Sequence, residues 1–282
     1  TMTTSELITL LSNHLSPLYD SRELEAIIRA VFEDVLHYSP VDMVLRENFE
    51  QDDVFVDKIK HIAMRLKEHE PLQYVLGHAS FHGHDFVVTP ATLIPRPETE
   101  RLVDMIVDEH GSQPDLKVLD MGTGSGCIAI SLARALKFAH VVGLDVSSEA
   151  LKVAQANGKA LHAPVDWLCD DMLTACPPHE VYDIVVSNPP YVLESEKSEI
   201  EPHVLNHEPA QALFVPNDDP LKFYRAITTY ASQALKSGGK LYLEINRRFG
   251  TEIQSLLESA GFDDVCISCD QFGQVRFATC MK

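Results

Sequence analysis

Four consecutive residues, Asn188, Pro189, Pro190 and Tyr191, offer the most specific chemistry in this 282-residue chain. They follow an apolar run over 182–187 that predicts a buried parallel strand. Two prolines in succession fix φ and remove two backbone donors, so the strand must end there. The carboxyl end of a strand in an open α/β sheet is where ligands bind. The position alone therefore makes this run a candidate site.

The chemistry of the same four residues suits a planar group that carries an NH2. The Asn188 amide can donate and accept hydrogen bonds, the Pro189 carbonyl adds an acceptor, and the Tyr191 ring adds a flat face. A side-chain amide and a nucleobase amine both have this shape. We predict a substrate site made of Asn188, Pro189, Pro190 and Tyr191, in which all but Pro190 are catalytic. The alternative is a proline-rich turn without a ligand.

A glycine-rich stretch, 120–126, lies between a predicted strand over 117–120 and a predicted helix over 128–136. Glycines at such a junction permit a tight turn and let a ligand approach the backbone closely. Asp145 ends the next predicted strand, where a carboxylate can accept hydrogen bonds from ribose hydroxyls. We therefore predict a site for an adenosine-containing cofactor at Gly122, Thr123, Gly124, Ser125, Gly126 and Asp145.

The spacing of these glycines favours S-adenosylmethionine over NAD. A dinucleotide site has the pattern G-x-G-x-x-G, whereas the third glycine here comes one residue early. S-adenosylmethionine has no pyrophosphate to hold, and Asp120 or its neighbours can face its cationic end. No Lys-Ser/Thr pair follows the glycines, so a nucleoside triphosphate loop is excluded. A NAD-dependent dehydrogenase and a non-catalytic binding module remain as alternatives.

Strands and helices alternate from about residue 95 onward. This alternation predicts a mostly parallel sheet covered on both faces, and a last strand pair without a helix between its members predicts one antiparallel edge strand. The polar stretch 192–219 predicts a long loop beside Asn188. The predicted strands are 117–120, 140–145, 165–168, 182–187, 240–245, 265–269 and 274–279, and the helices between them are 128–136, 148–161, 221–235 and 249–260.

The N-terminal part of the chain follows a different pattern. Residues 1–76 carry apolar side chains at helical spacing and no strand pattern, which predicts a small all-α domain. Residues 77–94 alternate around two phenylalanines and a glycine, which predicts a β-hairpin linker. Residues 95–282 then form the predicted catalytic domain. The helical domain shows no chemistry of its own, and we expect it to contact a protein substrate.

Composition narrows the choice of partners. The formal charge of −19 argues against binding to nucleic-acid phosphates and favours a basic protein partner. No apolar run is long enough to cross a membrane, and the start lacks the features of a signal peptide, so a cytoplasmic protein is expected. Cys266 and Cys269 form a lone CxxC without a second pair, so no metal site is predicted.

Three segments together resemble the PrmC/HemK family of release factor glutamine-N5 methyltransferases: 92–100 (TLIPRPETE), the glycine loop 120–126 and 187–191 (SNPPY). The resemblance covers nearly the full length. It implies an α/β fold, with a seven-stranded Rossmann-like S-adenosylmethionine-dependent methyltransferase domain joined by a β-hairpin to a small all-α N-terminal domain. Enzymes that methylate adenine N6 or guanine N2 share the Asn-Pro-Pro-Tyr run, so segment 92–100 is the discriminating one.

The resemblance also implies an activity and roles for matching residues. The expected reaction is methylation of the glutamine in the Gly-Gly-Gln motif of peptide chain release factors during translation termination. Adenine or guanine amino-group methylation on nucleic acid is the alternative.

The resemblance assigns residues to the cofactor as well. Arg96 and Thr99 would lie near the cofactor. Relatives often carry an aromatic residue at the position of Asp171, which here offers no ring to stack on the adenine. The segment 244–246 departs from a commoner Glu-x-Gly, so no site is predicted in that segment. The implied cofactor residues are Gly122 to Gly126, Asp145, Asp170, Asp171 and Asn188.

Overall fold

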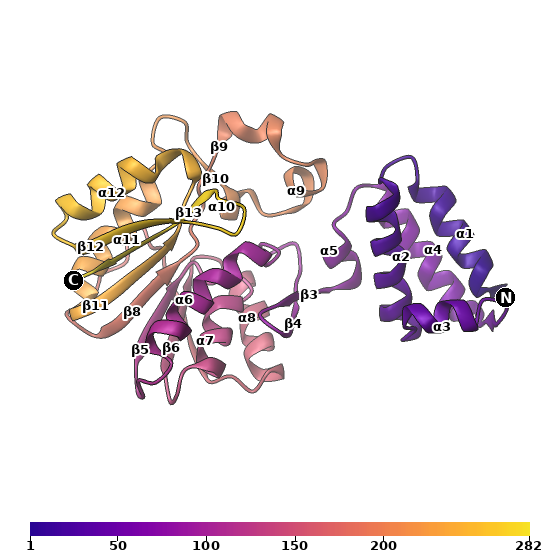
Figure 1. Ribbon diagram of the computed structural model, residues 1–282, viewed down its shortest axis with the longest axis horizontal. Helices are drawn as coiled ribbons and strands as arrows, with labels where there is room; N and C mark the ends of the chain where they lie inside the picture. Colours follow the sequence, from indigo (N-terminus) through magenta and orange to yellow (C-terminus); the bar gives the residue numbers. More distant parts are fainter. The chain divides into compact units, whose positions relative to one another are not determined.

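Helices make up most of the first 77 residues of the computed structural model, which describes residues 1–282 (Figure 1). The chain divides into two units, one of residues 1–77 and 201–207 and one of residues 78–200 and 208–282. The predicted boundaries after residues 76 and 94 stay predictions. The elements of the first unit are α1 (Thr4–Leu15), α2 (Ser21–Leu36), α3 (Pro40–Leu45), α4 (Asp53–Lys67), α5 (Leu72–Leu76), α9 (Pro202–His207) and the short antiparallel strands β1 (Met2–Thr3) and β2 (Glu50–Gln51).

Local sequence explains where these helices begin. Thr3 and Glu6 form a reciprocal capping box at α1, and Ser39 forms another with Asp42 at α3. Asp20 caps α2 by accepting from two backbone N–H groups. The apolar faces predicted from helical spacing pack together as one core. Its fully buried members are Leu7, Leu11, Leu15, Val31, Phe32, Ile59 and Leu66.

The second unit contains the predicted alternation of strands and helices. It starts with the hairpin β3 (His78–Phe81) and β4 (His84–Val87). Its remaining elements are η1 (Pro97–Thr99), α6 (Glu100–His110), β5 (Lys117–Met121), α7 (Cys127–Ala135), β6 (His140–Asp145), α8 (Ser148–Ala160), β7 (Val165–Cys169), β8 (Tyr182–Ser187), β9 (Val192–Leu193), η2 (Glu194–Glu199), α10 (Ala210–Leu213), β10 (Phe214–Val215), α11 (Lys222–Ala234), β11 (Leu235–Glu244), η3 (Arg247–Phe249), α12 (Gly250–Ser259), β12 (Asp263–Cys269) and β13 (Val275–Met281).

Seven strands form one sheet in the order β12-β13-β11-β8-β5-β6-β7. Helices α6, α7 and α8 cover one face, and α11 and α12 cover the other (Figure 1). The central strands β5 and β8 are buried on both faces, as continuous apolar runs predict. Their carboxyl ends therefore meet at one edge of the sheet. The predicted seven-stranded α/β fold is confirmed.

The prediction of an antiparallel edge strand is wrong. The antiparallel strand is β13, which lies between β11 and β12 and pairs with both. Helix α12 carries the chain past the position next to β11, so β12 forms the edge of the sheet. One strand position is then left open between β11 and β12. A tight turn around Gly273, with φ of +76°, returns the chain into that gap.

The prediction of a long loop over 192–219 is also wrong. This stretch contains β9, η2, α9, α10 and β10, and β9 pairs in parallel with β10. Its polar composition hid these elements because each is too short to show a period. Glu196 supplies part of the order, since its carboxylate accepts from the Leu193 N–H at 2.7 Å.

Candidate functional site

A cavity of about 420 Å³ lies at the carboxyl ends of β5, β6, β7 and β8, within the second unit. It is the place where a parallel sheet collects loop residues from several strands. Six of the sequence-predicted site residues line it, namely Gly122, Gly124, Asp145, Asp171, Asn188 and Pro190. The other six, Thr123, Ser125, Gly126, Asp170, Pro189 and Tyr191, lie in the same loops but do not line the cavity.

The glycine loop holds Asp145 in a fixed position. Gly122, Gly124 and Gly126 all have positive φ, which other residues rarely adopt. The Gly124 N–H donates to Asp145 Oδ2 at 2.8 Å, and the Ser147 N–H donates to Oδ1 at 2.9 Å. Each carboxylate oxygen keeps a lone pair that can accept a hydroxyl from a ligand. Asp145 can therefore hold a pair of neighbouring hydroxyls.

Behind the loop, the remaining predicted residues hold its shape. The Thr123 hydroxyl donates to Asp120 Oδ2 at 2.7 Å, and the Ser125 carbonyl accepts from Asn157 Nδ2 at 2.9 Å. A Cβ built on Gly126 would lie 2.9 Å from Cη2 of Trp167 and 3.0 Å from Cδ1 of Ile130. These three positions therefore support the shape of the glycine loop, and their predicted contact with a cofactor stays a prediction.

Replacing Gly126 with alanine is expected to destabilise the fold by about 2–4 kcal/mol, since it adds a close contact to an unfavourable φ of +83°. Gly261→Ala is the matched control because Gly261 has φ of +87° and nothing within 4 Å of an added Cβ. Urea unfolding of both variants measures the difference. Equal losses would show that the packing against Trp167 is not limiting.

Asp120 is a fully buried carboxylate beneath the glycine loop, and its Oδ1 has no hydrogen-bond partner. Burial raises its pKa to about 7, with the nearby Asp145 adding to the effect against the Thr123 hydrogen bond. A buried carboxylate with an unpartnered oxygen fits a loop that receives a cationic ligand. It would repel an anionic one.

The raised pKa of Asp120 predicts a specific pH dependence of stability. Because the folded-state pKa lies above the unfolded value, the stabilisation is present at low pH and is lost as pH rises toward 7. Relative to wild type, Asp120→Asn should gain about 2–3 kcal/mol of unfolding free energy between pH 5 and pH 8. Urea unfolding at the two pH values measures this gain. Asp166→Asn, at an exposed position on β7, should show no such gain; parallel curves for Asp120→Asn and wild type would contradict the prediction.

All charged side chains that line the cavity are acidic. Asp145, Glu149 and Asp171 line it, and no Lys, Arg or His does. A pyrophosphate normally needs backbone donors or basic side chains, so this lining disfavours a dinucleotide. It suits a cofactor with a net positive end.

Apolar side chains that were not predicted from the sequence form much of the cavity wall. They come from several separate segments, so no local pattern marks them: Leu93, Val146, Met172, Leu173 and Phe223. Asp171 lines the cavity while its Oδ1 accepts from the Leu173 N–H at 2.9 Å. Asp170 Oδ1 accepts from the Asp171 N–H at 2.8 Å, so Asp170 shapes the turn from outside the cavity.

The Asn-Pro-Pro-Tyr run presents two unoccupied acceptors. Asn188 is half-buried at the cavity, and its Nδ2 donates to Thr99 Oγ1 at 3.4 Å. Neither Asn188 Oδ1 nor the Pro189 carbonyl accepts a hydrogen bond from the protein. The Tyr191 hydroxyl donates to Glu244 Oε1 at 2.9 Å, and its ring packs on the apolar cluster under α11. Asn188 lines the cavity, so its Oδ1 can accept one hydrogen of an NH2 group there. The Pro189 carbonyl is a second acceptor next to it in the chain, although Pro189 is buried and does not line the cavity.

Two buried glutamates at the site were missed as site residues. Glu244, the last residue of β11, accepts from Thr99 and Tyr191. Glu208 accepts from the Ile94 N–H at 3.0 Å and pairs with Arg96 at 2.6 Å. That pair joins two segments that both contribute to the cavity wall. A buried carboxylate far along the chain from its partners leaves no local sequence signal.

Other candidate groups lie elsewhere. Asp183, a possible base by its place before the Asn-Pro-Pro-Tyr run, sits at the opposite end of β8, where it accepts from the Lys117 N–H and pairs with Lys236. No group of three His, Cys, Asp or Glu side chains is arranged to hold a metal ion. No helix is both long and apolar enough to span a membrane.

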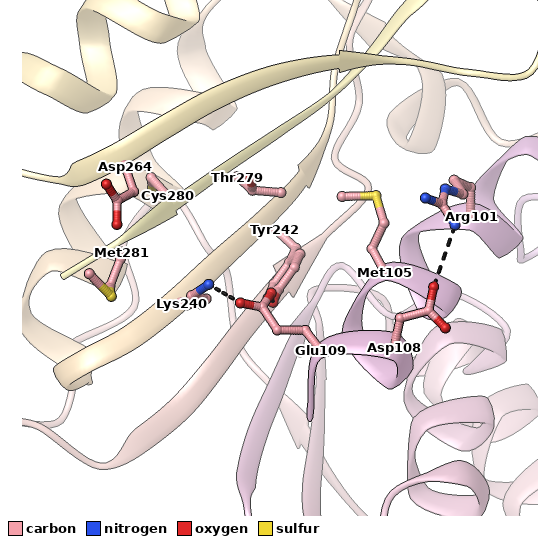
Figure 2. A pocket seen from close by; sticks show the side chains of 10 residues that line it. All are labelled: Arg101, Met105, Asp108, Glu109, Lys240, Tyr242, Asp264, Thr279, Cys280 and Met281. Carbon is pink, nitrogen blue, oxygen red and sulfur yellow. Dashed lines mark hydrogen bonds and ion pairs between the residues drawn. The ribbon is translucent and has the colours of Figure 1, made fainter. Parts of the chain in front are cut away.

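A second hollow of about 370 Å³ lies between α6 and the strands β11 and β13 (Figure 2). Figure 2 shows two ion pairs among its charged side chains, Lys240 with Glu109 and Arg101 with Asp108, while no ion pair is drawn to Asp264. The Tyr242 hydroxyl also donates to Glu109. No residue lines both this hollow and the cavity, so the two are separate.

Comparisons with known proteins match both units. Residues 6–77 match the family described as PrmC N-terminal domain, and residues 98–213 match the Methyltransferase small domain. A release factor glutamine methyltransferase of Bacteroides thetaiotaomicron is 42% identical over 94% of this chain and 95% of its own length. One of Flavobacterium psychrophilum is 41% identical over 93% of each. A solved 16S rRNA methyltransferase of Thermus thermophilus, in complex with AdoMet and guanosine, has a TM-score of 0.50 and 19% identity over 73% of this chain and 49% of its own, which shows the fold alone.

Proposed function

This chain belongs to the release factor glutamine methyltransferase family, and on that premise we propose that it methylates N5 of the glutamine in the Gly-Gly-Gln motif of peptide chain release factors. The observation that carries the proposal is the free acceptor Asn188 Oδ1 at an acidic cavity, with the Pro189 carbonyl as a second free acceptor next to it in the chain. Such an enzyme would act in the cytoplasm, where translation terminates.

The residues of the cavity fit S-adenosylmethionine as the methyl donor. When bound, this cofactor supplies an electrophilic methyl group on a sulfonium with a neutral leaving group. Gly122 and Gly124 would let it approach the backbone, Asp145 would accept from its ribose hydroxyls, and Asp171, which lines the cavity, would flank its adenine. The absence of basic residues in the lining supports a cationic ligand.

The task of the protein is to position a weak nucleophile. An amide nitrogen is unreactive because its lone pair is delocalised into the carbonyl. Asn188 Oδ1 and the Pro189 carbonyl would accept its two N–H bonds, aim the nitrogen and favour a pyramidal geometry with more lone-pair density. Transfer would form an N–C bond from the nitrogen lone pair in exchange for the S–C bond of the bound donor, and one N–H proton would leave to solvent.

The alternative substrate, an adenine or guanine amino group on nucleic acid, is not favoured. The same acceptors would fit it, but the adjoining segment carries Glu194, Glu196 and Glu199, and the chain has a formal charge of −19. A nucleic-acid substrate would need a basic surface to hold its phosphates. The curated relatives named above act, by their names, on release factors.

The test is incubation of a purified release factor with labelled S-adenosylmethionine and this enzyme. We expect one methyl group per release factor, on the glutamine of the Gly-Gly-Gln motif, by mass spectrometry of the digested product. A release factor with that glutamine replaced is the control and should take up no label. Label on ribosomal RNA or DNA but not on the release factor would overturn the proposal.

A further inference from the structure

Glu244 lies at the centre of the hydrogen bonds that hold the Asn-Pro-Pro-Tyr run. Its side chain is buried, and its two carboxylate oxygens contact different partners. Oε2 accepts from the Thr99 hydroxyl at 2.6 Å, and Oε1 accepts from the Tyr191 hydroxyl at 2.9 Å. Thr99 Oγ1 in turn lies 3.4 Å from Asn188 Nδ2. A carboxylate that contacts no cavity ligand is thus two hydrogen bonds away from the predicted catalytic amide.

The direction of these hydrogen bonds follows from the chemistry of a carboxylate. An ionised carboxylate only accepts, so both hydroxyls must donate to it. Burial and the neighbouring Glu244 raise the pKa of Tyr191, so its hydroxyl keeps its proton and donates. Burial also raises the pKa of Glu244, while the two hydroxyl donors and the positive charge of Arg276 oppose that effect.

The consequence reaches Asn188. Thr99 has one proton and gives it to Glu244, so toward Asn188 its oxygen can only accept. The NH2 of Asn188, and not its carbonyl oxygen, must therefore face Thr99. Oδ1 is then the atom left without a protein partner, ready to accept from a ligand. With the amide turned around, the site would present NH2 to NH2, and the substrate could not bind productively.

We propose that Glu244 is a positioning residue that acts through Thr99 to orient the Asn188 amide, so that the site accepts a substrate NH2. The same carboxylate fixes the Tyr191 hydroxyl, and Asn246 Nδ2 donates to the Tyr191 carbonyl at 2.9 Å, so the run is held at both ends. This inference rests on the proposed function for its substrate. It adds a requirement for the Glu244–Thr99 pair, which lies 145 residues apart in the chain.

The test compares two pairs of variants in the full-length enzyme. Thr99→Val removes the hydroxyl with little change of shape, and Thr99→Ser retains it. Glu244→Gln keeps the shape but has one acceptor oxygen for two hydroxyl donors. We expect Thr99→Val and Glu244→Gln each to lower kcat by about tenfold to a hundredfold, with KM for the release factor within about threefold of wild type. Thr99→Ser should regain most of the kcat that Thr99→Val loses.

The matched control is Thr229→Val, on an exposed face of α11, which should leave kcat unchanged. Because Glu244 is buried, Glu244→Gln could unfold; the Thr99 pair then decides the question, with unfolding curves to show that Thr99→Val is folded. The double variant Thr99→Val/Glu244→Gln should be no slower than the slower of the two single variants if both residues act on the same amide.

A readout without substrate separates this inference from the proposed function. The side-chain NH2 of Asn188, assigned in a ¹⁵N spectrum by comparison with Asn188→Ala, should exchange more slowly with water in wild type than in Thr99→Val. Wild-type enzyme that methylates no release factor would overturn the proposed function but leave this readout intact. Wild-type kcat in Thr99→Val, an equal loss in Thr99→Ser, or unchanged Asn188 exchange would overturn the positioning role.

Discussion

Replacing Asn188 with alanine is expected to lower kcat for methyl transfer by about two to three orders of magnitude, the largest effect at the proposed site. The side chain supplies one of the two acceptors that hold the substrate nitrogen, and its Oδ1 has no protein partner to give up on binding. Without it, the nitrogen keeps one hydrogen bond, to the Pro189 carbonyl, and can rotate about it.

The measurement is single-turnover methyl transfer to a release factor with the enzyme in excess. Affinity for S-adenosylhomocysteine should fall by less than about tenfold, because Asn188 is one of many residues that line the cavity. Asn48→Ala, at an exposed position in the helical unit, is the control. A kcat within fivefold of wild type would mean that the backbone carbonyl alone positions the nitrogen, and that Asn188 is not catalytic.

Much of the cavity could be predicted because its residues sit directly after strands. The apolar runs that become β5, β6 and β8 are local signals, and parallel strands bring their carboxyl ends together. Gly122, Asp145 and Asn188 follow or end these runs, so their meeting at one cavity required no knowledge of distant contacts. Their chemistry could therefore be proposed from type and position alone.

The supporting residues could not be predicted because their partners are far away along the chain. Thr99 meets Glu244 across 145 residues, and Arg96 meets Glu208 across 112. The place of β13 inside the sheet likewise depends on pairing with two strands at once. The spacing of apolar residues indicates which face of a helix or strand is buried, but it does not indicate which other element packs against that face.

Tyr191 shows that the orientation of a single side chain could not be predicted from the sequence either. Its ring was expected to pack on the substrate, yet the residue does not line the cavity, and its hydroxyl is directed to Glu244. A polar group buried at the end of an aromatic side chain needs a partner, and the partner decides the orientation. That partner lies in a segment where the sequence departed from the expected Glu-x-Gly, and no site was predicted there.

Replacing Asp145 with alanine should raise the Kd of S-adenosylmethionine by about a hundredfold or more, because each hydrogen bond to a charged group contributes about 1.5–3 kcal/mol. The carboxylate would accept from two ribose hydroxyls, and it also holds the Gly124 and Ser147 N–H groups. Its loss would therefore loosen the glycine loop as well as remove the ligand contacts. Asp166→Ala, at an exposed position on β7 outside the cavity, should leave the Kd unchanged.

Titration calorimetry with two ligands tells what Asp145 contributes. S-adenosylmethionine and S-adenosylhomocysteine share the ribose but differ in the charge on sulfur, so a contact to the ribose predicts equal losses for both. A loss confined to the charged ligand would show that Asp145 acts through its charge on the methionine end, and the assignment to the ribose would be wrong. Binding of NAD to the wild-type enzyme at comparable affinity would contradict the cofactor itself, because a cavity with three carboxylates and no basic residue should reject a pyrophosphate.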